Sequence, residues 1–389
     1  MTAPGNRGHP HGRRVEHPDG YHTYVPAPLP PPVTFSADVW RALSDADRLV
    51  GRLAGEARGL PNPHLLMRPF VRREAVLSSK IEGTTTTLPE LLAKEAGADV
   101  ERDPDDLAEV ANYIAALDLG VQRLQTERIS LDLVKDLHRR LMRGVRGHTK
   151  SPGVFRTVQV FIGRPGSPIH DATYVPPPAE KVPGCLEAWE TYLRDRSLPP
   201  LVQLALLHYQ FEAIHPFRDG NGRVGRLINT LFLLERGLPP SPFLCLSAFF
   251  EATRQEYYRR LLAVSREGDW DEWAAYVLNG VARQSEDAVS RAVRITALLD
   301  GWRRLLVGAR SDLPLKLVGD LAANPYCLVK AIAKREKVAY TTAERAVERL
   351  VKLKILRQVN KAERDRLFCA TAILDILEEP ANLTPESTG

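Results

Sequence analysis

The chain has 389 residues, with 53 Lys and Arg against 48 Asp and Glu, which gives a net charge of +5 at neutral pH. Its 44% hydrophobic and 26% charged residues are typical of a globular protein with two or three domains. The absence of any run of 18 apolar residues argues against a membrane span, and the first residues do not have the layout of a signal peptide. The four cysteines form no C-x-x-C pair, which favours reduced thiols and a cytoplasmic location.

The first 33 residues differ in composition from the rest of the chain. They hold eight prolines and few aliphatic residues, so little apolar surface is available to offset the entropy lost on ordering. We therefore expect residues 1–33 to be a disordered Pro-rich tail. Its end, at residues 26–32, favours extended polyproline geometry that could lie across the folded body.

From residue 36 to about residue 306 the apolar residues recur at helical spacing. The sequence therefore predicts a mainly α-helical body, followed by a separate C-terminal unit. Residues 154–163 and 172–175 depart from this pattern, because they alternate in polarity around turn residues and favour a β-hairpin packed on the helices. The expected parts are an N-terminal helical region at 34–110, a core at 111–283, a connector helix at 284–311, the C-terminal unit at 312–379 and a polar tail at 380–389.

The densest chemistry lies in a helix–loop–helix corner that reads His-Pro-Phe-Arg-Asp-Gly-Asn-Gly-Arg-Val-Gly-Arg from residue 215 to residue 226. Gly220 and Gly222 let the backbone approach a ligand closely, and free N–H groups of the next helix point at the loop. Arg223 and Arg226 add two guanidinium groups three residues apart on one helical face. The pattern predicts a site for a polyphosphate.

Two further residues of this corner carry chemistry beyond anion binding. Asp219 fits a polyphosphate site if Mg²⁺ lies between its carboxylate and the phosphates. His215 is the residue of the corner that can take up a proton near neutral pH. Together these groups favour attack by a hydroxyl on a nucleotide phosphate, although each of them alone is also common in ordinary helix caps and turns.

The corner resembles the signature of the Fic family, His-Pro-Phe-x-(Asp/Glu)-Gly-Asn-Gly-Arg-x-x-Arg, at every fixed position. The resemblance spans residues 35 to 300, where helices, hairpin and motif follow the family's order. It implies a Fic helical core with a β-hairpin flap, and transfer of AMP from ATP to Ser, Thr or Tyr hydroxyls of proteins. His215 would then be the base and Asp219 the Mg²⁺ ligand. Nucleotide phosphates would be bound by Gly220, Asn221, Gly222, Arg223, Gly225 and Arg226, with Phe217 packed inward to seat the loop.

The resemblance also assigns the surroundings of the loop. The flap backbone would align the target chain by strand addition, at Ile162, Gly163, Arg164 and Pro165. The candidates for the adenine pocket, with ordinary helix packing as the alternative, are Tyr257, Tyr258 and Trp270.

A second motif closes a helix that begins near residue 68. Gly83 would cap this helix, so Glu82 would lie at the negative end of the helix dipole, where a carboxylate needs a compensating cation. The string fits the family's inhibitory motif (Ser/Thr)-x-x-x-Glu-(Gly/Asn), with Ser78, Glu82 and Gly83 at its fixed positions. The resemblance implies that Glu82 pairs with Arg226 and takes the space of the γ-phosphate. An exposed glutamate at a helix end is the alternative.

Residues 330–366 carry twelve Lys and Arg against five Asp and Glu, a local net charge of +7. Three helices and a β-ribbon make a winged helix-turn-helix pattern, similar to the module attached to many Fic proteins, with residues 341–349 as its recognition helix. DNA is one expected partner. A protein, such as a second copy of the chain in a homodimer, is the other, and Glu344 and Glu348 on the recognition helix count against DNA.

These features lead to two hypotheses of function. The first is an autoinhibited protein adenylyltransferase that uses ATP and Mg²⁺, modifies proteins including itself, and can also remove AMP. The second is a nucleotide-sensing DNA-binding regulator with little transferase activity. The presence of His215 favours the enzyme, because sensing a nucleotide requires no base. Transfer of phosphate or UMP, rather than AMP, remains a third option.

Overall fold

A computed structural model describes residues 11–59, 63–100, 103–164, 166–239, 242–308, 311–362 and 365–381. Helices dominate this part of the chain, as the sequence predicts, and none of them has the length and apolarity needed to cross a membrane. In chain order the elements are β1 (Gly12–Glu16), β2 (His22–Pro26), α1 (Ala37–Gly59), α2 (Pro63–Ile81), α3 (Leu88–Glu95), α4 (Pro104–Arg123), α5 (Leu131–Leu141), α6 (Val182–Tyr192), α7 (Pro200–Ile214), α8 (Asn221–Glu235), α9 (Leu246–Ala252), α10 (Arg254–Glu267), α11 (Trp270–Leu305), α12 (Leu313–Leu321), β3 (Tyr326–Leu328), α13 (Val329–Glu336), α14 (Tyr340–Lys352), β4 (Arg357–Gln358), β5 (Leu367–Cys369) and α15 (Thr371–Glu378).

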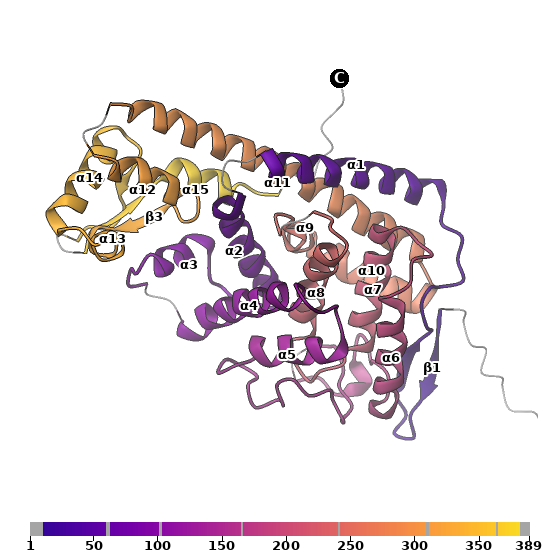
Figure 1. The fold of residues 1–389 in the computed structure, drawn as a ribbon. Coiled ribbons are helices and arrows are strands. Elements are labelled where there is room, and N and C mark those ends of the chain that lie inside the picture. Colours follow the sequence, from indigo (N-terminus) through magenta and orange to yellow (C-terminus); the bar gives the residue numbers. More distant parts are fainter. Residues whose placement is uncertain are drawn as a thin grey trace, which may run out of the picture.

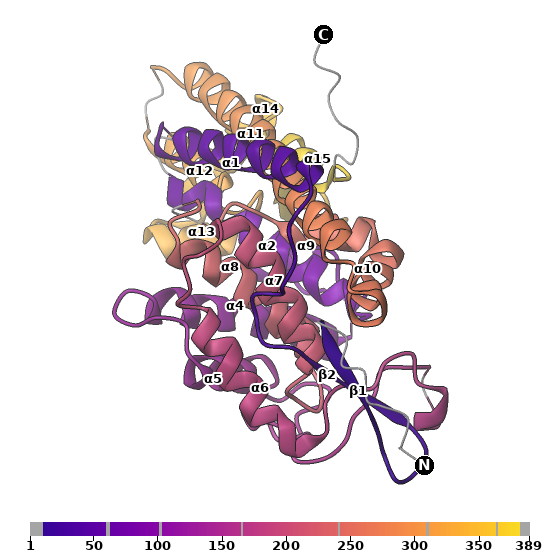
Figure 2. The same cartoon turned by 90° about the vertical axis from the view of Figure 1, so that its right-hand side faces the viewer.

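Helix α7 forms the centre of the body. Every residue from Leu201 to Phe211 is buried, which is typical of a helix that is covered on all sides. Helices α6, α8 and α11 pack against it, and α1 runs along α11 on the outside (Figures 1 and 2). The polyphosphate corner predicted from the sequence joins α7 to α8, so it is built between two core helices.

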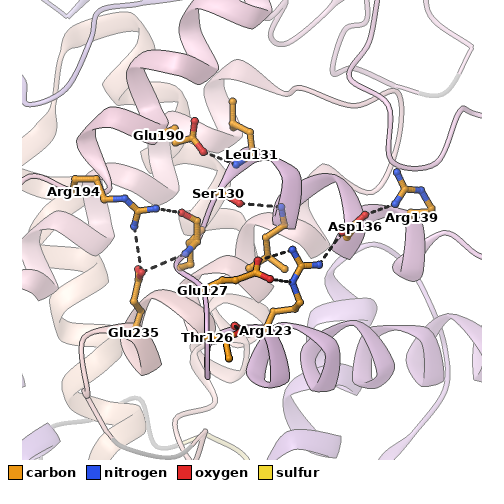
Figure 3. Close-up of polar contacts among 12 residues, drawn as sticks. Arg123, Thr126, Glu127, Ser130, Leu131, Asp136, Arg139, Glu190, Arg194 and Glu235 are labelled. Atoms are coloured by element: carbon orange, nitrogen blue, oxygen red, sulfur yellow. Dashed lines mark hydrogen bonds and ion pairs between the residues drawn. The ribbon is translucent and has the colours of Figure 1, made fainter.

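The connection between α4 and α5 is held by polar contacts rather than by regular structure (Figure 3). Nη2 of Arg123 lies 2.6 Å from Oε2 of Glu127, and its Nη1 lies 3.0 Å from Oδ2 of Asp136. Oγ of Ser130 accepts a hydrogen bond from the backbone N–H of Leu133 at 3.2 Å and caps α5. These contacts fix the start of α5, the helix that delivers His138 to the corner.

The expectation of a disordered N-terminus is wrong for residues 11–33. Strands β1 and β2 form an antiparallel ribbon at the end of the molecule farthest from the C-terminal unit (Figure 1). The backbone N–H of Tyr24 donates to the carbonyl of Val175 at 2.9 Å, and its phenol donates to the carbonyl of His11 at 2.8 Å. Buried aromatic rings, Tyr21 and Tyr24, supply the apolar surface that aliphatic residues do not provide. Residues 1–10 lie outside the described residues.

The predicted β-hairpin is less regular than its alternating pattern suggests. Its β-pairing in the described residues is a single bridge, in which Ile162 and Tyr174 exchange backbone hydrogen bonds of 2.8 and 3.1 Å. Side chains replace the missing ladder: the amide of Gln159 donates to the carbonyls of Val160 at 2.9 Å and Pro176 at 3.1 Å. We call residues 154–177 the flap. Its outer limb, residues 154–162, is therefore held by side-chain hydrogen bonds to the returning limb, residues 172–177.

The C-terminal unit contains the three helices and the ribbon that the sequence predicts. Strand β3 joins the ribbon to give an antiparallel sheet of order β3-β5-β4, and α15, which the sequence did not predict, follows it. Its identification as a winged helix-turn-helix stays a prediction. Helix α11 runs unbroken through residue 284, so the boundary expected between core and connector lies inside one helix.

Candidate active site

The corner between α7 and α8 turns within six residues. Helix α7 ends at Ile214 and is capped by His215, which adopts the left-handed conformation with φ 50° and ψ 63°, and α8 begins after Gly220, with φ 74°. The side chain of Asn221 closes the turn, because its Oδ1 accepts from the N–H of Phe217 at 2.8 Å and its Nδ2 donates to the carbonyl of Phe217 at 3.0 Å. The first N–H groups of α8 are thereby presented at the loop, as an anion site requires.

Phe217 packs inward, as predicted, on a histidine that the sequence analysis missed. Its ring stacks on His138 of α5 with centroids 3.7 Å apart. Nδ1 of His138 accepts from the N–H of Gly153 at 2.7 Å, so its Nε2 carries the proton and donates to the carbonyl of Asp219 at 3.0 Å. Burial lowers the pKa of His138 to about 4, so this ring holds the loop as a neutral group. A single histidine on an amphipathic helix gives no sequence signal for this role.

His215 is suited to act as a base. Burial, followed by the positive charge of Arg156, lowers the pKa of His215 to about 4, against the opposing effects of Glu82 and Asp219. The imidazole is therefore neutral at neutral pH and able to accept a proton.

Arg226 is engaged by the end of α2. Its Nη2 lies 2.6 Å from Oε1 of Glu82 and donates to the carbonyl of Ser78 at 2.9 Å, while its Nε donates to Oγ of Ser78 at 3.0 Å. Burial alone would raise the pKa of Glu82, but Arg226 outweighs it and holds that pKa below its usual range. A side chain at Gly222 would collide with the Glu82 carboxylate and Arg226, so the carboxylate lies against the backbone of the loop. Gly83 follows with φ 100°, which suits its predicted role as a helix stop.

The other arginine of the corner, Arg223, points into the protein. Nη1 of Arg223 lies 2.8 Å from Oε2 of Glu109 on α4, and the two side chains are only 4% and 1% exposed. Arg146 approaches the other oxygen of Glu109 at 3.4 Å. The sequence pattern did not reveal Glu109, because it lies 114 residues before its partner.

Asp219 already has a cation beside it. Nζ of Lys150 lies 2.8 Å from its Oδ2, and the N–H of Gly220 donates to its Oδ1 at 2.7 Å. Burial raises the pKa of Asp219, but Lys150 outweighs this and keeps the carboxyl ionised. Among the described residues no group of three or more His, Cys, Asp or Glu could cage a metal. One ionised carboxylate at a phosphate site nevertheless fits Mg²⁺, which binds through few protein ligands when phosphates supply the others.

The candidates for the adenine pocket separate in the structure. Tyr257 is buried, and its hydroxyl lies 2.9 Å from Nε2 of His208. Tyr258 is 44% exposed, and the charges of Glu82 and Arg226 act on its pKa, so it borders the corner. Trp270 lies instead at the N-terminal ribbon, where its Nε1 donates to Nδ1 of His11 at 3.0 Å, and ordinary packing accounts for it.

The remaining predicted residues lie at the edges of the site. Gly225 lets α8 approach α7 closely, since a side chain there would meet the Glu212 carboxylate at 2.5 Å. Ile162 makes the bridge of the flap, and Gly163 and Arg164 follow it in an exposed turn. Pro165 lies outside the described residues.

Comparisons with known proteins point to the family whose signature the corner resembles. Residues 40–122 match the profile described as Fic/DOC family N-terminal, and residues 128–233 match that of the Fic/DOC family. Protein adenylyltransferase fic-1 of Caenorhabditis elegans is 29% identical over 221 residues, which are 55% of this chain and 39% of that protein. Protein adenylyltransferase Fic of Nematostella vectensis is 33% identical over 119 residues, 30% of this chain and 25% of that one. The matches thus span about two fifths or less of the length of these relatives.

The fold also has a solved counterpart. A Fic family protein from Desulfovibrio desulfuricans G20 superposes with a TM-score of 0.60 over 88% of this chain and 98% of its own. At 22% identity this likeness shows the fold alone.

Proposed function

Because the chain belongs to the Fic/DOC family, we propose that it is a protein adenylyltransferase that Glu82 holds in an inhibited state. One observation carries the proposal: a neutral His215, the N-terminus of α8 and the ion pair between Glu82 and Arg226 meet at one corner. The relatives named above as protein adenylyltransferases support AMP as the transferred group.

In the proposed reaction the phosphates of ATP lie at the N-terminus of α8. His215 takes the proton of a Ser, Thr or Tyr hydroxyl of the target protein. The hydroxyl oxygen bonds to the α-phosphorus, the bond from that phosphorus to the β-phosphate oxygen breaks, and pyrophosphate leaves. Mg²⁺ bound at Asp219 would neutralise charge on the phosphates. Positioning and charge neutralisation are the main sources of rate for such a transfer.

Glu82 restrains this reaction by occupying Arg226. The terminal phosphate of ATP and the Glu82 carboxylate compete for one guanidinium, and the carboxylate also lies over Gly222. Its side chain is 31% exposed, so it can leave the site when a signal draws it away. As a secondary activity, the same carboxylate orients a water molecule that removes AMP from a modified protein.

Transfer of label from ATP to protein tests the proposal. Wild type, Glu82→Gly and the double variant Glu82→Gly/His215→Ala are incubated with Mg²⁺ and ATP labelled at the α- or the γ-phosphate. We expect strong labelling from α-labelled ATP by Glu82→Gly alone. Labelling from γ-labelled ATP, or undiminished labelling by the double variant, would refute the assignment.

A second candidate function, a nucleotide-sensing DNA-binding regulator, is favoured by the surface of α14. Arg345, Arg349 and Lys352 are exposed at helical spacing on one face, and none of them forms an ion pair with a described residue. Glu344, which the sequence analysis counted against DNA, is paired with Arg366. Unpaired cations on the exposed face of a helix are suited to phosphate contacts.

Binding to duplex DNA at increasing salt tests this second candidate. The variant Arg345→Glu/Arg349→Glu is compared with Arg41→Glu, which reverses an exposed charge on α1. The candidate predicts affinity that falls with salt and is lost only in the α14 variant. Equal binding by both variants, or none by wild type at low salt, would remove it.

A further inference from the structure

Arg156 is a buried arginine whose side chain binds only backbone carbonyls among the described residues. It is 3% exposed and forms no ion pair with a described residue. Its own N–H also donates, to the carbonyl of Pro216 at 2.8 Å. The side-chain donors and their acceptors are Nε to His215 at 2.8 Å, Nη2 to Pro177 at 2.6 Å and to Ile214 at 3.3 Å, and Nη1 to Val158 at 3.3 Å.

These acceptors belong to two parts of the site. Val158 and Pro177 lie on the outer and the returning limb of the flap, whose backbone pairing is limited to one bridge. The other acceptors are Ile214, the last residue of α7, and His215, which caps it. A non-glycine residue in the left-handed conformation is strained, so His215 needs a partner that holds its backbone. One guanidinium therefore joins both limbs of the flap to the residue proposed as the base.

The charge of Arg156 also bears on His215. Burial lowers the pKa of Arg156 to about 10, so it remains charged at neutral pH without a carboxylate partner. Next to burial, this charge is the largest influence that lowers the pKa of His215. Glu82 and Asp219 oppose it, and Glu212 lies one turn earlier on α7. A cation placed at the carbonyl of His215 thus disfavours protonation of the imidazole.

We propose that Arg156 is a positioning residue that fixes the flap and His215 as one unit, so that a hydroxyl aligned by the flap meets the base at a set distance. The proposal rests on the adenylyl transfer proposed above. It adds that the charge of Arg156 keeps the His215 imidazole unprotonated before the reaction. It also adds that this side chain, rather than a β-ladder, stiffens the irregular flap.

Three variants in the Glu82→Gly background test it. Arg156→Met loses the hydrogen bonds and the charge, while Arg156→Lys keeps the charge but not the planar fork. Arg291→Met is the control for loss of a buried arginine away from the site, because Arg291 is equally buried and donates to backbone carbonyls at the end of α15, although it is also paired with Asp287. A misplaced base costs about 100-fold in rate. We expect that loss in kcat for Arg156→Met, about tenfold for Arg156→Lys, little change in KM for ATP, and no loss of kcat for Arg291→Met.

The pH profile separates positioning from a merely structural role. Loss of the cation raises the pKa of His215, so the acidic limb of kcat/KM moves to higher pH in Arg156→Met. It stays near its parental position in Arg156→Lys, because the charge is kept. Equal shifts in both variants, or none in either, would contradict the electrostatic part of the inference.

Hydrogen exchange of the nucleotide-free protein tests whether Arg156 holds the flap and the catalytic loop together, and it requires no activity measurement. We expect faster exchange at residues 158–163 and 216–222 together in both Arg156 variants, and at neither segment in Arg291→Met. If Glu82→Gly transfers no label, the proposed function fails, yet the exchange data still decide whether Arg156 links the flap to the loop that follows His215. If Glu82→Gly is active and Arg156→Lys matches it in kcat and in exchange, the inference is overturned, whether or not Arg156→Met folds.

Discussion

Oε1 of Glu82 lies 2.6 Å from Nη2 of Arg226, although 144 residues separate them in the chain. Nε of the same guanidinium donates to the hydroxyl of Ser78, and its Nη2 donates to the carbonyl of Ser78. Nε and Nη2 of the arginine proposed to bind a terminal phosphate are therefore already bound by the end of one helix. This contact links the segment proposed as inhibitory to the corner proposed as catalytic.

Replacing Glu82 by Gln separates the charge of this contact from its bulk. The amide keeps the volume over Gly222 but loses the ionic part of the bond to Arg226, which is worth roughly tenfold in rate. We expect a labelling rate between those of wild type and Glu82→Gly. A Gln variant as slow as wild type would mean that bulk alone restrains the site.

Removing Lys150 should strengthen binding of a divalent cation. Its ammonium group competes with the metal for Asp219, but it is 47% exposed, so the pair is weak. For Lys150→Met with ATP bound, calorimetric Mn²⁺ titration should give an affinity about twofold to fivefold higher. Lys135→Met, which removes a similar pair on α5, is the control and should leave the affinity unchanged. Weaker Mn²⁺ binding by Lys150→Met would show that the lysine assists the metal instead.

Glu212 makes the stability of the protein depend on pH. Burial raises its pKa from 4.5 to about 7, and its Oε1 has no hydrogen-bond partner. The folded state therefore holds a proton that the unfolded state releases, so this group's contribution is present below pH 4.5 and is lost as the pH rises through 7. Glu212→Gln should be more stable than wild type by about 1–3 kcal/mol at pH 8 and equal to it at pH 4.

Urea unfolding at these two pH values checks the effect, with the exposed Glu187→Gln as control. If Glu212→Gln gained the same stability at both pH values, ionisation would not be the cause.

Asp287 holds two buried arginines at the junction of α2, α11 and the C-terminal unit. It lies 3.3 Å from Nη1 of Arg73 and 2.8 Å from Nε of Arg291, whose Nη2 donates to the carbonyl after α15. Asp287→Ala leaves both cations buried without a carboxylate partner and should lower the free energy of unfolding by about 3–5 kcal/mol. Denaturant unfolding measures this loss. Asp38→Ala, which breaks an exposed pair with Arg41, should change it by at most about 1 kcal/mol.

The α7–α8 corner and the end of α2 could be predicted because short-range spacing determines both. Pro216 and Gly220 fix where α7 stops and α8 starts, and Gly83 fixes the end of the segment that carries Glu82. Each signal lies within a dozen residues, and the family resemblance supplied their pairing. The mainly helical fold followed from apolar periodicity for the same reason.

Other parts of the site depend on tertiary packing and left no local signal. Arg156 lies 59 residues before the histidine that it holds, and its single charge in an alternating stretch looks like any exposed strand residue. His138 and Glu109 lie on amphipathic helices where a polar residue is ordinary. The N-terminal ribbon was missed because its stabilising surface comes from tyrosines rather than aliphatic residues.

Peptide mass spectrometry of Glu82→Gly after incubation with unlabelled ATP and Mg²⁺ tests the central claim most directly, because it identifies the transferred group and the atom that receives it. We predict an AMP adduct on Ser, Thr or Tyr hydroxyls of the protein, absent from Glu82→Gly/His215→Ala. A phosphate adduct, an AMP adduct that persists without His215, or no adduct while ATP is bound would contradict the account.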